Sequence, residues 1–262
     1  MIRIESILKS VGIPLYGVCD FDKEHLLECR NKRLIPENAQ SIIMTAFPYR
    51  LPDEFYNGRN ISRYAVVWDY HEVVGMYLQK AVEKLKEKFP DNEFVSFTDN
   101  SPVYEVNSAV KAGLGVRGDN GLLITEEYGS WVFLGEIVTD MKLDCEEHHG
   151  ECLHCGKCKN ICDAVSGNKK ELCLSAITQK KGELTQAEKQ KITENESAWG
   201  CDLCQEICPM NSDKKCTSVE EFISFPKAEI SVGDSMEKRA YAWRGQAVID
   251  RNLRILGKEV EI

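Results

Sequence analysis

The spacing of the cysteines constrains this chain more than any other feature of its sequence. Ten of the twelve cysteines lie between residues 145 and 216. The first run reads Cys152-x2-Cys155-x2-Cys158-x3-Cys162, and its short loops can bring successive thiolates to one metal centre. This spacing is typical of [4Fe–4S] clusters. The chain is therefore predicted to hold iron and sulfide rather than disulfides.

A second run, Cys201-x2-Cys204-x3-Cys208-Pro209, has the terminal Cys-Pro of ferredoxin runs but lacks one internal cysteine. A cluster built on it needs another thiolate, and Cys173 lies between the two runs. In two-cluster proteins the fourth cysteine of a run binds the other cluster. Two clusters are predicted, one held by Cys152, Cys155, Cys158 and Cys208, the other by Cys162, Cys173, Cys201 and Cys204.

A zinc site is the alternative interpretation of part of this region. Cys145, His148, His149 and Cys152 could compose one tetrahedral site. Zinc needs only pairs of cysteines, however, and it gives no function to the third and fourth cysteines of each run. Iron–sulfur clusters are therefore favoured.

Four cysteines remain outside the predicted ligand sets, and a small buried or idle thiol is favoured for each. They are Cys19, Cys29, Cys145 and Cys216. Either Cys145 or Cys216 could replace Cys173 as a ligand of the second cluster, and the sequence leaves this choice open.

Composition and charge narrow the class of protein. The 262 residues are 43% hydrophobic and 29% charged, which is ordinary for a globular protein with a buried core. No apolar run approaches the roughly 20 residues of a membrane-spanning helix, and the N-terminus lacks a secretory signal. We expect a cytoplasmic protein without a membrane partner. The net charge of −9 does not indicate a general nucleic-acid binder.

The hydrophobic pattern predicts an α+β domain before the cysteines. Strands are predicted at 41–47, 94–98, 121–125 and 131–138, with the last two forming a hairpin. Helices are predicted at 70–89, 102–112 and 236–256, and residues 179–195 are expected to be an exposed helix or loop. Pro90 ends the long helix. The predicted division is 1–144 for the α+β domain, 145–216 for the cluster domain and 217–262 for a C-terminal helical segment.

Several separated motifs, in order along nearly the whole chain, resemble the epoxyqueuosine reductase family. They are Ile61–Ala65, Asp69–His71, Thr98–Val103, Ala112–Gly115, Gly129–Glu136 and Gly200–Gln205. The core is also similar to that of reductive dehalogenases. The resemblance implies a cobalamin-binding α/β sandwich domain followed by a ferredoxin-like two-cluster domain.

The resemblance also implies an activity and its cofactors. Enzymes of this family reduce epoxyqueuosine in tRNA to queuosine, with electrons passing from two [4Fe–4S] clusters to cobalamin. An electron donor such as ferredoxin or flavodoxin is then expected. We expect an oxidoreductase of queuosine biosynthesis and tRNA processing.

Asp99 corresponds to the proton donor of the family. Opening an epoxide leaves an alkoxide, which leaves poorly until it is protonated, and a carboxylic acid could deliver that proton if burial raised its pKa. The pattern alone favours another role for Asp99, as an N-cap of a helix that follows Ser101-Pro102. The resemblance favours the catalytic role.

The same resemblance implies cobalamin contacts at Asp99 and five other residues, namely Arg63, Leu123, Thr125, Ser130 and Leu134. Ordinary strand packing or a solvated charge would explain these five residues equally well. His71, at the start of the long helix, could contact a cofactor or serve a structural role, and it is not assigned as a cobalt ligand.

Some residues depart from the family pattern. Asp119 stands where relatives carry lysine, and Asp163 replaces the proline after Cys162. Longer members continue into C-terminal helical repeats that help to hold tRNA, and this sequence ends at residue 262. A basic stripe on the last helix could compensate, although a solvated face is favoured; its members would be Arg239, Arg244, Arg251 and Arg254.

These departures leave two alternative functions open. One is a related cobalamin-dependent reductase of a small molecule or of a corrinoid protein. The other is a non-enzymatic two-cluster electron carrier, in which substitution of Asp99 would affect no turnover.

Overall fold

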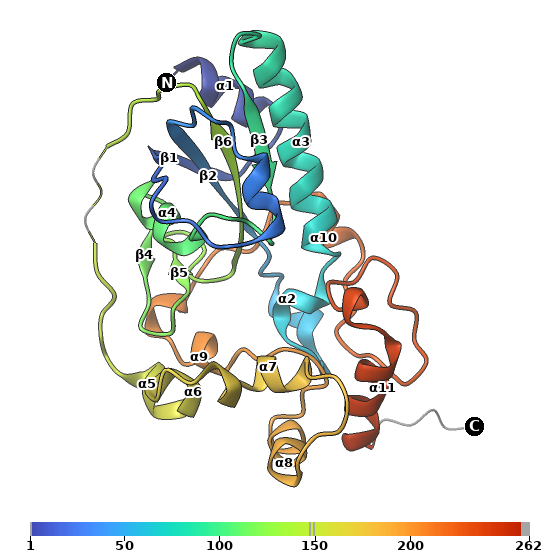
Figure 1. The fold of residues 1–262 in the computed structure, drawn as a ribbon. Helices are drawn as coiled ribbons and strands as arrows, with labels where there is room; N and C mark the ends of the chain where they lie inside the picture. The colour runs from blue at the N-terminus through green and yellow to red at the C-terminus, as the bar shows by residue number, and fades with distance from the viewer. Residues whose placement is uncertain (1, 147, 149, 258–262) are drawn as a thin grey trace. The chain divides into compact units, whose positions relative to one another are not determined.

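The computed structural model describes residues 2–146, 148 and 150–257, and it divides into two compact units (Figure 1). The first unit combines Met1–Pro48 with Tyr70–His154, and the second combines Tyr49–Asp69 with Cys155–Ile262. Each unit is therefore assembled from two separate stretches of chain. The linear division into 1–144, 145–216 and 217–262 stays a prediction.

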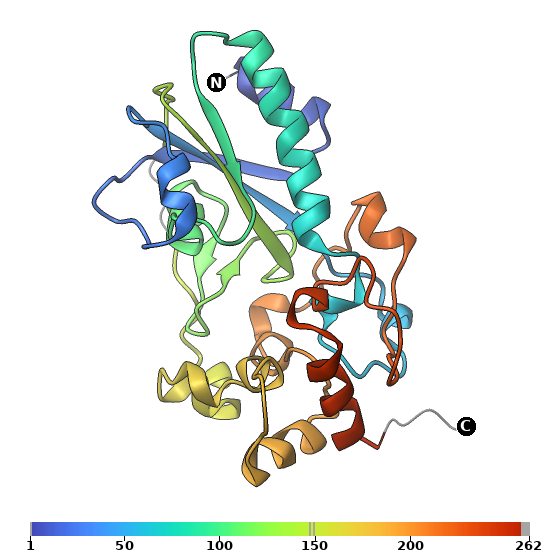
Figure 2. The same cartoon turned by 45° about the vertical axis from the view of Figure 1, so that its right-hand side comes forward.

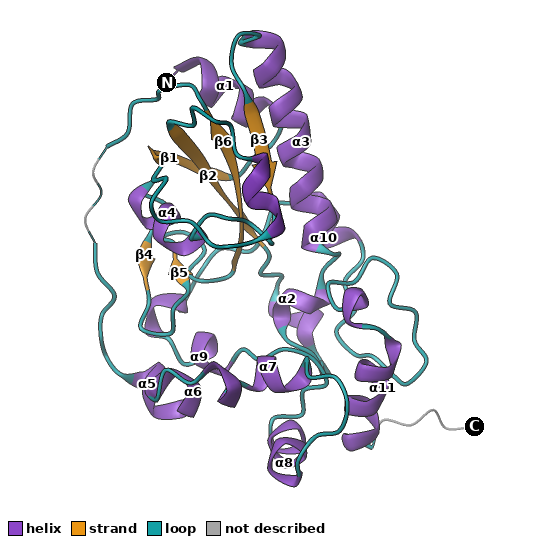
Figure 3. Cartoon of the chain, viewed as in Figure 1, coloured by secondary structure: helices purple, strands orange, loops and turns teal. Residues whose placement is uncertain are grey.

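The first unit is built on an antiparallel sheet of four strands in the order β1-β2-β6-β3 (Figure 3). The strands are β1 (Leu15–Asp20), β2 (Ser41–Pro48), β6 (Val132–Thr139) and β3 (Phe94–Phe97). Every residue of β2 is buried, which fits a central strand with both faces covered. A small second sheet pairs β4 (Val116–Arg117) with β5 (Leu123–Ile124). The predicted mixed α+β class is confirmed.

Helices cover both faces of the four-stranded sheet. The long helix α3 (Tyr70–Lys88) packs on β3 and β6 and also contacts α1 (Ile2–Ser10), as Figures 1 and 2 show. The short helix α4 (Glu105–Lys111) contacts β1, β2 and β6 and contributes to a separate apolar cluster. The predicted long helix is confirmed; it ends two residues before Pro90, because proline cannot continue a helix.

The predicted hairpin between residues 121–125 and 131–138 is wrong. Strand β5 pairs with β4, whereas β6 pairs with β2 on one edge and β3 on the other. Between the two strands only a bridge, Thr125 to Gly129, closes the turn. A long, buried strand such as β6 gains more from pairing with the eight residues of β2 and the four residues of β3 than from a two-residue partner. Turn residues between two strands therefore did not mean that the strands pair.

The second unit consists of short helices. These are α2 (Arg63–Val66), α5 (Lys157–Ile161), α6 (Asp163–Ser166), α7 (Leu174–Thr178), α8 (Gln186–Glu194), α9 (Leu203–Glu206), α10 (Glu220–Ser224) and α11 (Gln246–Ile255). Short 3-10 helices are η2 (Asp53–Tyr56), η3 (Lys170–Leu172), η4 (Pro209–Asn211) and η5 (Ala242–Arg244), while η1 (Arg30–Leu34) belongs to the first unit. Helices this short are not stable alone, so tertiary contacts must hold them.

The last helix is shorter than predicted. It begins at Gln246 rather than near residue 236, because Gly245 adopts φ 92°, a conformation that interrupts a right-handed helix. Asn252 on α11 is fully buried, and its Nδ2 donates to the carbonyls of Thr178 and Ala198, each at 2.8 Å. The helix is thereby tied to the polypeptide around the second cysteine run.

Three of the four arginines that the sequence suggested for a basic stripe bind backbone carbonyls of their own unit, and the stripe itself stays a prediction. Arg239 donates to the carbonyls of Val66 and Phe225, at 3.0 and 2.9 Å. Arg251 donates to the carbonyl of Lys180 at 2.8 Å, and Arg244 binds the carbonyl of Gln179. These guanidinium groups satisfy backbone acceptors of the same unit. Within residues 2–146, 148 and 150–257, no helix has the length and apolarity to cross a membrane.

Candidate functional site

Asp99 lies in a tight loop directly after β3. Asp99 and Asn100 both adopt positive φ angles, 55° and 50°. Such left-handed backbone is unfavourable for residues with a side chain, and Asp and Asn tolerate it best. The Asn100 carbonyl accepts from Asn31 Nδ2 at 3.1 Å and from Cys29 Sγ at 3.6 Å. The loop is held in a strained shape by its neighbours, which is common at functional sites.

The side chain of Asp99 contacts His71 near the start of α3. The Nε2 atom of His71 lies 3.0 Å from Oδ2 of Asp99. This hydrogen bond is the main reason that the pKa of Asp99 is lowered. Burial acts in the opposite direction but is outweighed, so the raised pKa that the donor role was expected to need is not found; the side chain is 57% exposed. The N-cap role is also wrong, because the residue that caps α4 is Tyr104.

Aromatic rings line the polypeptide next to His71. Tyr70 stacks on Phe133 of β6, with ring centroids 4.4 Å apart and planes at 9°. Tyr70 also stacks on His71, at 4.0 Å and 28°. The stack fixes the imidazole that faces Asp99. Tyr70 and Phe133 were not predicted from the sequence as site residues, although both lie within the family motifs.

Two carboxyl groups near Asp99 were also missed. Glu136 on β6 is fully buried and accepts a hydrogen bond from the hydroxyl of Ser101. Burial raises the pKa of Glu105, on α4, to about 7, with a further contribution from the charge of Asp99. Burial and Glu105 raise the pKa of Glu136 well above its usual range. A lone acid within the apolar strand 131–138 was the signal that could have identified Glu136.

The four residues expected to form a cobalamin floor lie around β5 and the start of β6. Leu123, Thr125 and Ser130 are buried, and Leu134 is half-buried. The hydroxyl of Thr125 donates to the Gly129 carbonyl at 3.0 Å and accepts from the amide of Tyr128. Leu123 and Leu134 pack in the apolar cluster beside α4. Their contact with a corrin stays a prediction.

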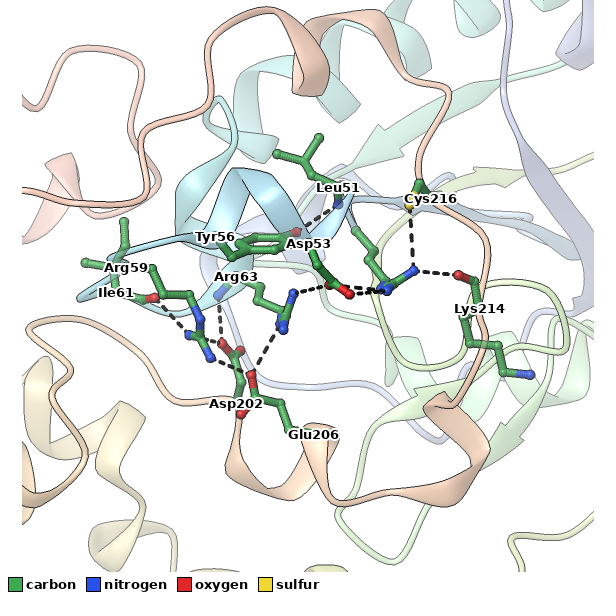
Figure 4. Close-up of polar contacts among 11 residues, drawn as sticks. Leu51, Asp53, Tyr56, Arg59, Ile61, Arg63, Asp202, Glu206, Lys214 and Cys216 are labelled. Atoms are coloured by element: carbon green, nitrogen blue, oxygen red, sulfur yellow. Dashed lines mark hydrogen bonds and ion pairs between the residues drawn. The ribbon is translucent and has the colours of Figure 1, made fainter.

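Arg63 belongs to the second unit and is surrounded by partners there (Figure 4). Its guanidinium carbon lies 4.1 Å from the ring centroid of Tyr56. Its Nε lies 3.3 Å from Glu206, and its Nη1 lies 3.4 Å from Asp53. A cobalamin contact for Arg63 stays a prediction, while these contacts give it a structural role next to the second cysteine run.

A buried acid anchors that run. Asp202, directly after Cys201, accepts from Nη1 of Arg59 at 2.9 Å and from the backbone amide of Arg63 at 2.8 Å (Figure 4). Burial raises the pKa of Asp202 to about 6. Arg59 also pairs with Glu206, between Cys204 and Cys208 in the sequence. Residues 59–63 thus fix the loop that presents the second run.

None of the twelve cysteines forms a disulfide. Burial raises the pKa of the Cys201 thiol to about 12, and the nearby thiols of Cys173 and Cys204 contribute to that shift. The structure therefore brings together three of the four residues predicted to bind the second cluster. Helices α5 and α9, which carry Cys158 and Cys204, also contact each other.

The two cysteines left open as replacements for Cys173 have other surroundings. The Sγ atom of Cys216 lies 3.6 Å from the Nη1 atom of Arg50, which donates to it (Figure 4). Cys145 is exposed, and its side chain interacts with Asp20 of β1. The alternative zinc site included His149, which lies outside the described residues. The potential ligand atoms of Cys152, Asp119 and His154 lie within 4.8 Å of one another. Cys152 therefore has Asp119 and His154 as neighbours, which neither the cluster nor the zinc interpretation expected.

Comparisons with known proteins agree on one family. The family described as "Epoxyqueuosine reductase QueG, DUF1730" matches residues 30–100. An epoxyqueuosine reductase from Lactococcus garvieae is 30% identical over 259 residues, covering 89% of this chain and 73% of that protein. One from Gloeobacter violaceus is 40% identical over 194 residues, covering 70% of this chain and 60% of the relative.

Solved structures extend the likeness to the fold. Epoxyqueuosine reductase from Streptococcus thermophilus superposes with a TM-score of 0.78 at 25% identity, over 97% of this chain and 80% of that one. An epoxyqueuosine reductase with an epoxyqueuosine-modified tRNA-Tyr stem loop gives a TM-score of 0.80 at 26% identity, with the same coverage. The resemblance drawn from the motifs is confirmed: the chain belongs to the epoxyqueuosine reductase family.

Proposed function

We propose that this protein is an iron–sulfur, cobalamin-dependent epoxyqueuosine reductase that converts epoxyqueuosine in tRNA to queuosine. The observation that carries the proposal is the Asp99 loop, in which a strained backbone presents a carboxyl group hydrogen-bonded to His71. In a related epoxyqueuosine reductase from Bacillus subtilis, the loop of a catalytic aspartate is swung out of the active site. Asp99, with the proton that its hydrogen bond to His71 holds, is proposed to protonate the epoxide oxygen as the carbon–oxygen bond opens.

The cysteines suit two [4Fe–4S] clusters with the ligand sets predicted from their spacing. Cys173 and Cys204 lie close enough to Cys201 to contribute to the raised pKa of its thiol, and thiolates are the ligands that such clusters require. Cys162 is proposed as the fourth ligand of that cluster. Salt bridges of Arg59 with Asp202 and of Arg63 with Glu206 stabilise the conformation of the second run and leave its thiols available for metal binding.

Cobalamin is proposed to bind beside Asp99. Tyr70 is stacked between Phe133 and His71, so the half-buried His71 ring at the end of this stack is the proposed aromatic neighbour of a corrin, and Asp99 supplies a polar group beside it. When bound, cobalamin would supply a low-valent cobalt that engages the substrate. Arg63, Leu123, Thr125, Ser130 and Leu134 remain the proposed further contacts.

The substrate is proposed to be a tRNA anticodon stem loop, as in the relative crystallised with one. Three arginines of the last helical segment donate to backbone carbonyls of their own unit, which leaves them fewer donors for phosphate groups. A tRNA substrate also supports a cytoplasmic location.

A small acidic electron carrier such as ferredoxin or flavodoxin is the proposed reductant. Helix α5 and the segment that follows it carry the exposed side chains of Lys157, Lys169 and Lys170, in a chain of net charge −9. The exposed side chain of Ile161 adds an apolar contact among them. These residues flank Cys158 and Cys162, so an acidic partner seated there would lie next to the cluster ligands.

Reversing this charge should slow electron delivery. We expect the double variant Lys169→Glu/Lys170→Glu to be reduced about tenfold more slowly by reduced flavodoxin in stopped-flow measurements at low salt. Reduction by dithionite, which needs no docking surface, should be unchanged. Lys189→Glu, on the exposed face of α8, is the matched control. Equal rates for the double variant and the control would exclude this surface.

The proposed function is tested by reconstituting the protein anaerobically with iron and sulfide and adding cob(II)alamin. A shifted electron paramagnetic resonance spectrum of cobalt is expected, followed by conversion of epoxyqueuosine in a synthetic tRNA stem loop. Absence of any corrinoid binding would contradict the proposal and favour an electron carrier. Turnover of the free nucleoside but not of the stem loop would indicate a small-molecule reductase.

A further inference from the structure

Reduction of an epoxide to an alkene consumes two protons. Both carbon–oxygen bonds break, a carbon–carbon double bond forms, and the oxygen leaves as water after accepting two electrons and two protons. The electrons come from the iron–sulfur clusters of the proposed function, on which this inference rests. A single carboxyl group can hold only one proton, so Asp99 alone cannot supply both.

One proton is already placed next to the site. The 3.0 Å contact between His71 Nε2 and Asp99 Oδ2 requires a proton between these atoms, because two unprotonated acceptors would repel each other. Whichever atom carries it, the His71–Asp99 pair holds one transferable proton. The second proton needs another group.

Glu136 is the group that the fold places for this purpose. On β6 it lies in register with Met44 of β2 and Phe97 of β3, and directly paired residues share a face of the sheet. The carboxyl group is therefore enclosed by apolar side chains, all of them buried. Its Oε1 accepts from Ser101, and its buried Oε2 has no hydrogen-bond partner among the residues that the structure describes.

A carboxylate with one oxygen buried and unpaired is unfavourable in such surroundings, whereas a neutral carboxylic acid is tolerated. The other titratable groups that face Glu136 are acidic. Glu105 comes from α4 and Asp99 from the loop after β3, and each disfavours a negative charge on Glu136. Desolvation acts in the same direction, so burial and the neighbouring acids together favour the protonated form of Glu136.

Ser101 connects this acid to the catalytic loop. Its hydroxyl donates to Glu136 and accepts from the amide of Val103 at 3.0 Å, so it links β6 to the segment two residues after Asp99. We propose that Glu136 holds the second of the two protons that epoxide reduction consumes: once the Asp99 carboxyl group has given its proton to the epoxide oxygen, the proton of Glu136 passes to the Asp99 carboxylate, and the Ser101 hydroxyl stabilises the carboxylate left on Glu136. Glu136 does not touch the substrate; it is a positioning and proton-storing residue.

The proton itself is tested by infrared difference spectroscopy on the intact protein. The difference spectrum, wild type minus the Glu136→Gln variant, should contain the carbonyl stretch of one protonated carboxylic acid at neutral pH. The spectrum of the Glu136→Asp variant should retain such a band. This readout needs neither cofactor nor substrate. Absence of the band in the wild type would overturn the inference.

The role in turnover is tested by the pH profile on epoxyqueuosine-modified stem loop. Glu136→Gln should lose about tenfold in rate on the alkaline side, and the loss should shrink as pH falls and solvent supplies the proton. Glu136→Asp should restore most of the wild-type profile, and Glu93→Gln, on the exposed loop before β3, is the control. A Glu136→Gln profile equal to wild type would overturn the role, while an inactive wild type would contradict the proposed function itself.

If the Glu136→Gln variant does not fold, the Ser101→Ala variant tests the proposed role of Glu136 instead. It leaves the buried acid in place and removes only the hydroxyl that joins it to the loop. The infrared band should shift, and the rate should become more sensitive to alkaline pH. An unshifted band with a wild-type pH profile would contradict the proposed path.

Discussion

Replacing Asp99 by Asn should lower epoxyqueuosine reduction by about 100- to 10,000-fold, the range typical of losing a general acid. The amide has nearly the shape of the carboxyl group and can still contact His71, but it cannot release a proton to the epoxide oxygen. The left-handed backbone at this position is also tolerated by Asn, so the loop should keep its conformation. The measurement is single-turnover conversion of the modified stem loop.

The same variant should keep its cofactors, which separates a catalytic defect from a folding defect. Iron content and the cobalt spectrum should match those of the wild type. Asp91→Asn, in the exposed turn before β3, serves as the matched control and should turn over normally. A fully active Asp99→Asn protein would remove Asp99 from the mechanism and revive the electron-carrier alternative.

Replacing Cys173 by Ser should cost the protein one of its two clusters. Iron per chain should fall from about eight to about four, because a [4Fe–4S] cluster held by three thiolates is easily lost. The closeness of Cys173 to Cys201 is the structural reason to expect this result. Electron transfer, and with it stem-loop turnover, should then fail. Chemical iron analysis and the spectrum of the reduced clusters would measure the change.

Two other cysteines are the controls for this experiment. Cys145→Ser and Cys216→Ser should keep about eight irons per chain, since Cys145 is exposed and Cys216 contacts Arg50. If Cys216→Ser lost half its iron while Cys173→Ser did not, Cys216 rather than Cys173 would be the ligand of the second cluster. The first cluster should survive in all three variants.

The elements that the sequence predicted well have strong, local hydrophobic patterns. Helix α3 and strands β2, β3 and β6 are examples, because their apolar residues repeat with the period of their own structure. Strand β1 was not predicted. Its Gly17 breaks the strand pattern, and the structure explains the glycine: a Cβ there would lie 1.9 Å from the carbonyl oxygen of Ala112, at the end of α4.

The candidate site was harder to predict than the clusters. Candidate cluster ligands follow a spacing along the chain, so the sequence alone could propose them, although it left the choice among Cys173, Cys145 and Cys216 open. His71 and Asp99 are 28 residues apart, and Glu136 reaches Ser101 across 35 residues, so only the fold brings these groups together. The low pKa of Asp99 could not be predicted either, because it depends on the contact with His71.

The chain leaves the first unit after Pro48, returns to it at Tyr70 and leaves it again after His154. The excursion between these points carries the arginines that neutralise Asp202 and Glu206 in the cysteine runs. A protein fragment of residues 155–262 would therefore contain the buried Asp202 without the arginine that pairs with it. A buried charge without its partner is strongly destabilising. This redox module cannot be cut out and fused to another enzyme as a cassette, and evolution could exchange it only together with the loop between β2 and α3.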